Sequence, residues 1–97
     1  MNIKINVYAD CTSDEPTKTY TIKRILFKTA KELTAIQSQS KTAKDEEQTE
    51  ITLKMLQTVI PEFTAEDLDG VDPFELGEFF RSVGAEINAV VAKAEKN

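Results

Sequence analysis

Apolar residues alternate with more polar ones at the start of the chain, the period of two that is typical of a β-strand with one buried face. The alternating apolar positions are Ile3, Ile5 and Val7. Residues 17–27 are rich in Thr, Tyr and Ile, and residues 10–16 carry Asp, Ser and Pro, which favour a loop. We therefore predict a β-hairpin over about residues 2–27. The apolar run at 25–27 suits either the end of the second strand or the start of a helix.

Helical spacing of apolar residues begins after the hairpin. Thr29 and Glu32 have the spacing of a capping box, which predicts a helix over about 30–38. The uniformly polar run at 37–42 is expected to be a mobile loop. Apolar residues then recur at intervals of three and four, behind a cluster of acids that the helix dipole favours. This pattern predicts a second helix over about 44–60, which a proline ends.

A third helix should be very short. Thr64 can cap a helix over about 65–69. Gly70 follows it directly and is expected to close the helix in the left-handed conformation.

The strongest local signal in the chain predicts a long final helix over about 73–95. Asp72 is a good cap, Pro73 has no N–H to leave unpaired at the first helical position, and Glu75 completes a capping box. Apolar residues follow at steps of four and three: Leu76, Phe80, Val83, Ile87, Val90 and Ala94. Such a stripe packs along another helix, either within the domain or on a partner chain.

Together these elements predict an α+β fold that is mainly α, with a small N-terminal β-hairpin and three to four helices, the last one long. A chain of 97 residues has the size of one domain. We therefore expect a single domain over residues 1–97.

The charge balance argues against nucleic acid as a partner. With 17 acidic and 12 basic side chains the formal charge is −5, which repels a phosphate backbone. No apolar run approaches the ~20 residues that cross a bilayer, so no membrane association is expected. Cys11 is the single cysteine and cannot form an intramolecular disulfide, which favours a reducing compartment, the cytoplasm.

Residues suited to catalysis or metal binding are scarce. The chain has no histidine, the commonest transition-metal ligand. A calcium loop centred on Gly70 would place its first and last ligands at Ala65 and Leu76, which have no side-chain oxygen. We therefore predict that the chain is not an enzyme and takes no metal and no cofactor. The acids of this region are expected to lie at the surface on helix ends: Glu66, Asp67, Asp69, Asp72, Glu75 and Glu78.

The segment 63–72 reads Phe-Thr-Ala-Glu-Asp-Leu-Asp-Gly-Val-Asp and precedes an acidic and apolar helix. With the strand-rich N-terminus, the Lys-Arg-Ile-Leu-Phe run at 23–27 and the acidic helix at 45–60, it resembles the small tail assembly chaperones of long-tailed bacteriophages and of prophages in Gram-positive bacteria. The resemblance extends loosely over the whole chain.

The resemblance implies a protein that coats the long, helical tape measure protein and keeps it soluble until tail tube subunits polymerise around it. The tape measure protein is then the expected partner, with the tail tube protein as a second candidate and self-association allowed. The expected location is the host bacterial cytoplasm and not the mature virion. In this family, ribosomal frameshifting near the end of the reading frame often yields a longer form.

Apolar side chains on and before the last helix are the candidate contacts with a client, and each is equally suited to the core. They are Phe63, Leu68, Phe74, Leu76, Phe79, Phe80, Val83 and Ile87. Two other functions remain open. The chain could be a small acidic inhibitor, similar to an antitoxin, that occupies a basic site on another protein, or a permanent structural component of a phage particle.

Overall fold

The computed structural model describes the backbone of residues 2–41 and 44–96, and the side chains as far as Val90. In chain order its elements are β1 (Ile3–Val7), β2 (Lys18–Ile22), α1 (Phe27–Ser40), α2 (Asp45–Val59), α3 (Ala65–Asp69) and α4 (Pro73–Lys96). The predicted fold class is confirmed: a small N-terminal β-hairpin precedes a mainly helical chain whose last helix is long.

The hairpin has one apolar face, as the alternation predicted. β1 and β2 pair antiparallel, with Ile3 opposite Ile22 and Ile5 opposite Tyr20. Ile3, Ile5 and Ile22 are buried, so the paired strands present a continuous apolar surface to the helices. Because β2 ends at Ile22 and α1 begins at Phe27, the apolar run at 25–27 leads into the helix and is not part of the strand.

Helix α1 differs from its prediction at both ends. It begins at Phe27 behind the cap residue Leu26, which makes no side-chain capping bond, so the capping box predicted at Thr29 is not formed. The predicted mobile loop is also wrong as far as it is described, since residues 37–40 are helical and 42 lies outside the described residues. Two physical causes hold this end helical. The Gln48 side-chain amide donates to the Ser40 carbonyl oxygen at 2.9 Å, and α1 packs against α2.

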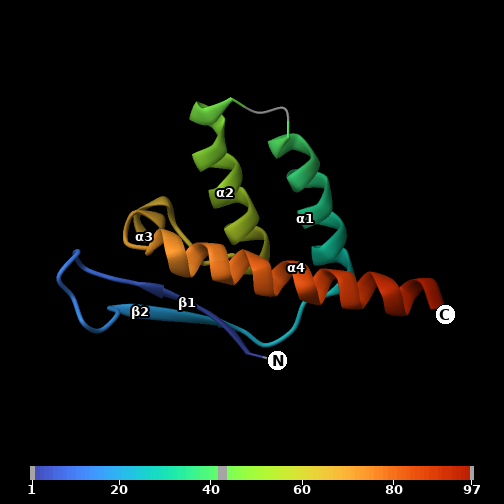
Figure 1. Ribbon diagram of the computed structural model, residues 1–97, viewed down its shortest axis with the longest axis horizontal. Helices are drawn as coiled ribbons and strands as arrows, with labels where there is room; N and C mark the ends of the chain where they lie inside the picture. Colours follow the sequence, from blue (N-terminus) through green and yellow to red (C-terminus); the bar gives the residue numbers. More distant parts are fainter. Residues whose placement is uncertain (1, 42–43, 97) are drawn as a thin grey trace.

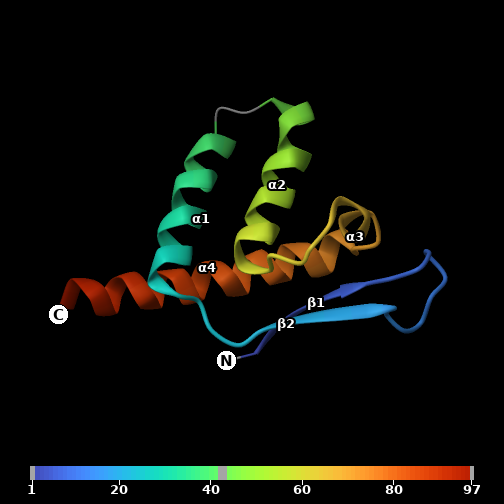
Figure 2. The ribbon, with the colours of Figure 1, turned by 180° about the vertical axis from the view of Figure 1, so that it is seen from behind.

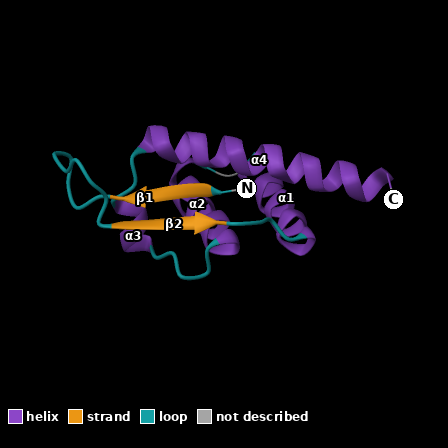
Figure 3. Cartoon of the chain, turned by 90° about the horizontal axis from the view of Figure 1, so that it is seen from below, coloured by secondary structure: helices purple, strands orange, loops and turns teal. Residues whose placement is uncertain are grey.

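Helices α1 and α2 run antiparallel and pack side by side, and α1 also contacts α4 (Figures 1 and 2). The bounds of α2 match the prediction to within one residue, with acidic residues in its first turn. The C-terminal half of α2 contributes Leu56 to the core, and Ile60, the first residue after the helix, is also buried there. Seen from below in Figure 3, the hairpin lies beside α4 with β1 as the nearer strand.

The predicted capping of α3 is confirmed, but the role of Gly70 is not. Thr64 and Asp67 form a reciprocal capping box at the start of this helix. Gly70 has a φ of −97°, which is not left-handed. A Cβ atom at this position would lie 2.6 Å from the carbonyl oxygen of Tyr8 and 2.8 Å from Cγ1 of Val7. Glycine is therefore needed because the chain passes close to β1, where the Tyr8 N–H donates to the Gly70 carbonyl oxygen at 2.7 Å.

Side chains from the hairpin and from the helices α1, α2 and α4 meet in one core. Tyr20 and Phe63 join the sheet to the segment after α2, with their ring centroids 5.4 Å apart. The buried apolar residues are Ile3, Ile5, Val7, Ile22, Ile25, Ala30, Leu33, Leu56, Ile60, Phe63, Phe79 and Val83. The N-terminal half of α4 is thus fixed against β1, and this positions the surface described next.

Candidate protein-binding surface

The structure divides the predicted contact residues into three groups. Phe63, Phe79 and Val83 are only 1%, 2% and 4% exposed, so the chain's own core occupies them. The half-buried residues that pack against this core are Leu68, Leu76, Phe80 and Ile87. Phe74 alone of the predicted set is largely exposed, at 87%. The apolar stripe of α4 therefore packs within the domain from Leu76 to Val90. The predicted stripe residue Ala94 lies outside the described side chains.

Local geometry at the start of α4 turns Phe74 away from the core. Residues two apart on a helix are separated by about 200°, so a helix that packs Leu76 against the core presents Phe74 on the opposite side. The carboxylate of Asp72 caps the helix and accepts the Phe74 N–H at 2.8 Å. The exposed ring thus stands on the first turn of a capped helix.

Glu75 anchors this turn to the hairpin. Its carboxylate accepts hydrogen bonds from Asn6 Nδ2 at 2.9 Å and from the Tyr8 hydroxyl at 2.7 Å. The predicted capping box at Asp72 is therefore incomplete, because Glu75 binds β1 instead of the cap residue's N–H. The hydrogen bond to Glu75 also raises the pKa of Tyr8. The helix turn that carries Phe74 is therefore attached both to the rest of α4 and to the hairpin.

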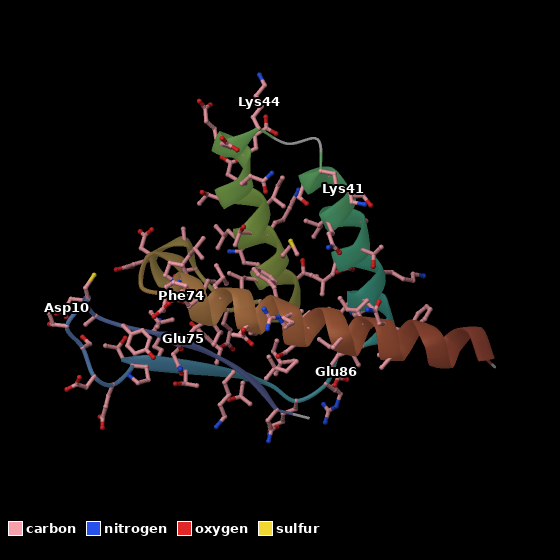
Figure 4. All side chains as sticks on the ribbon, in the orientation of Figure 1. Asp10, Lys41, Lys44, Phe74, Glu75 and Glu86 are labelled. Atoms are coloured by element: carbon pink, nitrogen blue, oxygen red, sulfur yellow. The ribbon has the colours of Figure 1, made fainter. Side chains whose placement is uncertain are left out.

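A groove of about 570 Å³ lies on one side of Phe74, between the β1–β2 loop and the α3–α4 connection. Every charged residue that lines it is a carboxylate: Asp10, Asp14, Asp69, Asp72 and Glu75. A second groove, of about 350 Å³, lies along β1 and α4 and shares Phe74 and Glu75 with the first. Figure 4 shows Asp10, Phe74 and Glu75 at the same end of the molecule. We call Phe74 with the first groove the acidic groove.

The loop wall of the acidic groove is ordered by Asp10. Its Oδ1 accepts hydrogen bonds from the Thr12 N–H and hydroxyl at 2.9 and 2.7 Å, and from the Ser13 hydroxyl at 3.1 Å. These bonds lower the pKa of Asp10, so the carboxylate stays ionised. The sequence prediction missed this wall. Its only signal was that two separate segments, 10–15 and 66–75, carry acids and no bases.

Asp67 is not at the surface, contrary to the sequence prediction. It is 4% exposed and binds the Lys18 ammonium at 2.9 Å and the Tyr20 hydroxyl at 2.7 Å. Burial is the largest single influence on its pKa and raises it. Hydrogen bonds from Tyr20, Lys18 and Thr64 together outweigh burial and lower the pKa of Asp67 to about 2. This carboxylate therefore serves as a structural link between β2 and α3.

An exposed apolar pair outside the predicted set of contact candidates lies at the β2–α1 junction. Leu26 and Phe27 are 51% and 49% exposed, and the Lys31 ammonium lies 5.5 Å from the Phe27 ring centroid. The exposed neighbours in the sequence are basic: Lys23, Arg24 and Lys28. The surface here therefore has the opposite charge to the acidic groove.

The fold and these surfaces define a small α+β protein with an exposed aromatic side chain beside an acidic groove. Within the described part of the chain, no group of three or more His, Cys, Asp and Glu residues could hold a metal ion. None of the helices described here combines the length and apolar character needed to cross a membrane. Comparison of the chain with protein-family models, with curated proteins and with solved structures finds no match in any of the three.

Proposed function

We propose that this chain is a non-catalytic tail assembly chaperone that binds a tape measure protein in the host cytoplasm and keeps it soluble. The observation that carries the proposal is Phe74, a large apolar side chain that is 87% exposed on a capped helix start that Glu75 hydrogen-bonds to the hairpin. An elongated helical client exposes apolar stripes that such a side chain can cover. The segment 63–72, which carries the family resemblance, also contributes Asp69 and Asp72 to the groove beside this ring.

Co-expression with the tape measure protein encoded in the same genome tests the proposal. We expect the wild-type chain to raise the soluble yield of the tape measure protein and to co-purify with it. Phe74→Ser should lower both while leaving the chaperone folded, because the ring is outside the core. The matched control is Arg81→Ser, an exposed position on the same helix that forms an ion pair with Glu78 at 3.0 Å. A tape measure protein that stays insoluble with the wild-type chain would contradict the proposal.

The second candidate is an acidic inhibitor of a basic protein site, which the all-carboxylate charge of the groove favours. The two functions differ in their dependence on salt. Exposed ion pairs are screened as the ionic strength rises, whereas apolar burial persists. A complex that weakens with salt but survives 1 M NaCl, because the apolar contact at Phe74 remains, supports the chaperone, and a complex that is lost by 0.3 M NaCl supports the inhibitor.

A further inference from the structure

We propose that the acidic groove binds a basic segment of a partner protein that carries an apolar side chain beside its Lys or Arg residues. The inference deepens the proposed function, on which it rests for the identity of the natural partner. It specifies the chemistry of the segment that the groove receives.

Charge complementarity selects this occupant. The groove wall comes from two parts of the chain, the β1–β2 loop and the segment that joins α3 to α4, and all charged side chains on it are carboxylates. Closely spaced like charges repel one another, and a Lys or Arg side chain from a partner would relieve that repulsion. An acidic or nucleic acid partner would add to it. The groove therefore discriminates by sign of charge.

Phe74 supplies the apolar part of the contact. Its ring stands at the rim of the groove, and Val71 lines the groove as a half-buried apolar neighbour. An aromatic side chain surrounded by polar groups that a partner can cover is the usual composition of a binding hot spot. A segment with only basic residues would leave this ring in water, so the partner segment must carry an apolar side chain as well.

The test uses the full chain and a fluorescein-labelled 18-residue helical peptide of Leu and Lys, with fluorescence anisotropy as the measurement. We expect binding of this peptide and no binding of the matched Leu and Glu peptide. Phe74→Ser and the double variant Asp14→Lys with Asp69→Lys should each weaken binding about tenfold or more. Neither Asp14 nor Asp69 makes a side-chain hydrogen bond or ion pair in the described part of the chain, so both variants should fold.

The control is Glu32→Lys with Glu62→Lys, which changes the net charge equally at exposed positions outside the groove. It should leave the affinity within about twofold. Equal weakening by the control and by the groove variant would show attraction to net charge alone and would overturn the inference. Self-association of the wild-type chain that Phe74→Ser abolishes would instead place a second copy in the groove and also overturn it.

The inference and the proposed function fail separately. Peptide binding with the expected variant pattern, together with a tape measure protein that stays insoluble, would leave the groove as a basic-segment site on a protein with another function. If the complex with the tape measure protein tolerates Asp14→Lys with Asp69→Lys, the chaperone function stands, but the acidic groove is not its contact surface.

Discussion

At the scale of single residues, Asp67 links the strand β2 to the helix α3, and this makes stability depend on pH. Its pKa is lowered from 3.8 to about 2 in the folded chain. The stabilisation that it provides is therefore complete above pH 4 and is lost as the pH falls towards 2. Asp67→Asn should lower the free energy of unfolding by about 1–3 kcal/mol at pH 7, because the Lys18 and Tyr20 donors lose a charged acceptor.

Urea unfolding followed by circular dichroism between pH 7 and pH 2 checks this prediction. The difference between the wild type and Asp67→Asn should shrink over the window from pH 4 to pH 2. Asp69→Asn is the matched control, since this neighbouring acid is exposed and makes no side-chain hydrogen bond among the described residues. A difference that stays constant down to pH 2 would contradict the assignment.

Gly70 is the second residue whose identity the fold dictates. Its φ of −97° suits any residue, so the obstacle to a side chain is space. Gly70→Ala would place a Cβ 2.6 Å from a backbone oxygen of β1 and should destabilise the protein by about 1–3 kcal/mol. Gly77→Ala meets nothing within 4 Å in α4 and should stabilise it by up to about 1 kcal/mol. Thermal unfolding of both variants measures these changes in stability. Equal effects of the two substitutions would contradict the prediction that Gly70 is needed for space.

At the scale of elements, α4 has one face in the core and one at the surface, and two of its three aromatic residues, Phe79 and Phe74, mark these two faces. Phe79→Ala should cost about 3–5 kcal/mol of folding free energy, because the ring is 2% exposed and its removal leaves a cavity. Phe74→Ala should change stability by less than about 0.5 kcal/mol. Denaturant midpoints distinguish the two. Large destabilisation by Phe74→Ala would mean that this ring packs in the core.

Elements that depend on neighbouring residues could be predicted from the sequence. The alternation in β1, the Thr64 cap of α3 and the Asp72–Pro73 start of α4 are all local signals, and the structure has each element there. The ends of α1 depend on contacts between distant segments. Ile25 enters the core just before α1 begins. Packing against α2 keeps the polar C-terminal end of α1 helical. A local capping signal at Thr29 could not reveal either contact.

The same distinction explains the candidate site. Phe74 could be named from the sequence as one of several apolar residues, but its exposure depends on which side of α4 the hairpin covers. The acidic groove forms only because the loop at 10–14 meets the segment 69–75. The burial of Asp67 likewise requires Lys18 and Tyr20, which lie more than 40 residues earlier in the chain. Pattern analysis contains no information on such pairings.

At the scale of the whole molecule, stability should be unevenly distributed. The buried side chains of α1 are Ala30 and Leu33, both in its N-terminal half, and the buried side chain of α2 is Leu56, in its C-terminal half. The other halves of these helices extend away from the hairpin and from α4 (Figure 1). The acidic groove lies on the opposite, well-packed part, where hydrogen bonds from Asn6 and Tyr8 fix Glu75. Binding there should require no rearrangement of the fold.

Amide hydrogen exchange measured by NMR tests this division. Helical amides with few buried apolar contacts open with low free energy, so residues 37–40 of α1 and 49–52 of α2 should exchange fastest among the hydrogen-bonded amides. The amides of Ile5, Leu56 and Val83, whose side chains are 0%, 0% and 4% exposed, should exchange slowest. Binding of the Leu and Lys peptide should slow exchange near Phe74 and leave residues 37–40 unchanged, because Phe74 and Lys41, the C-cap residue of α1, lie on separate parts of the molecule (Figure 4). Protection at 37–40 equal to that of Leu56 would show that the paired helices are as stable as the core.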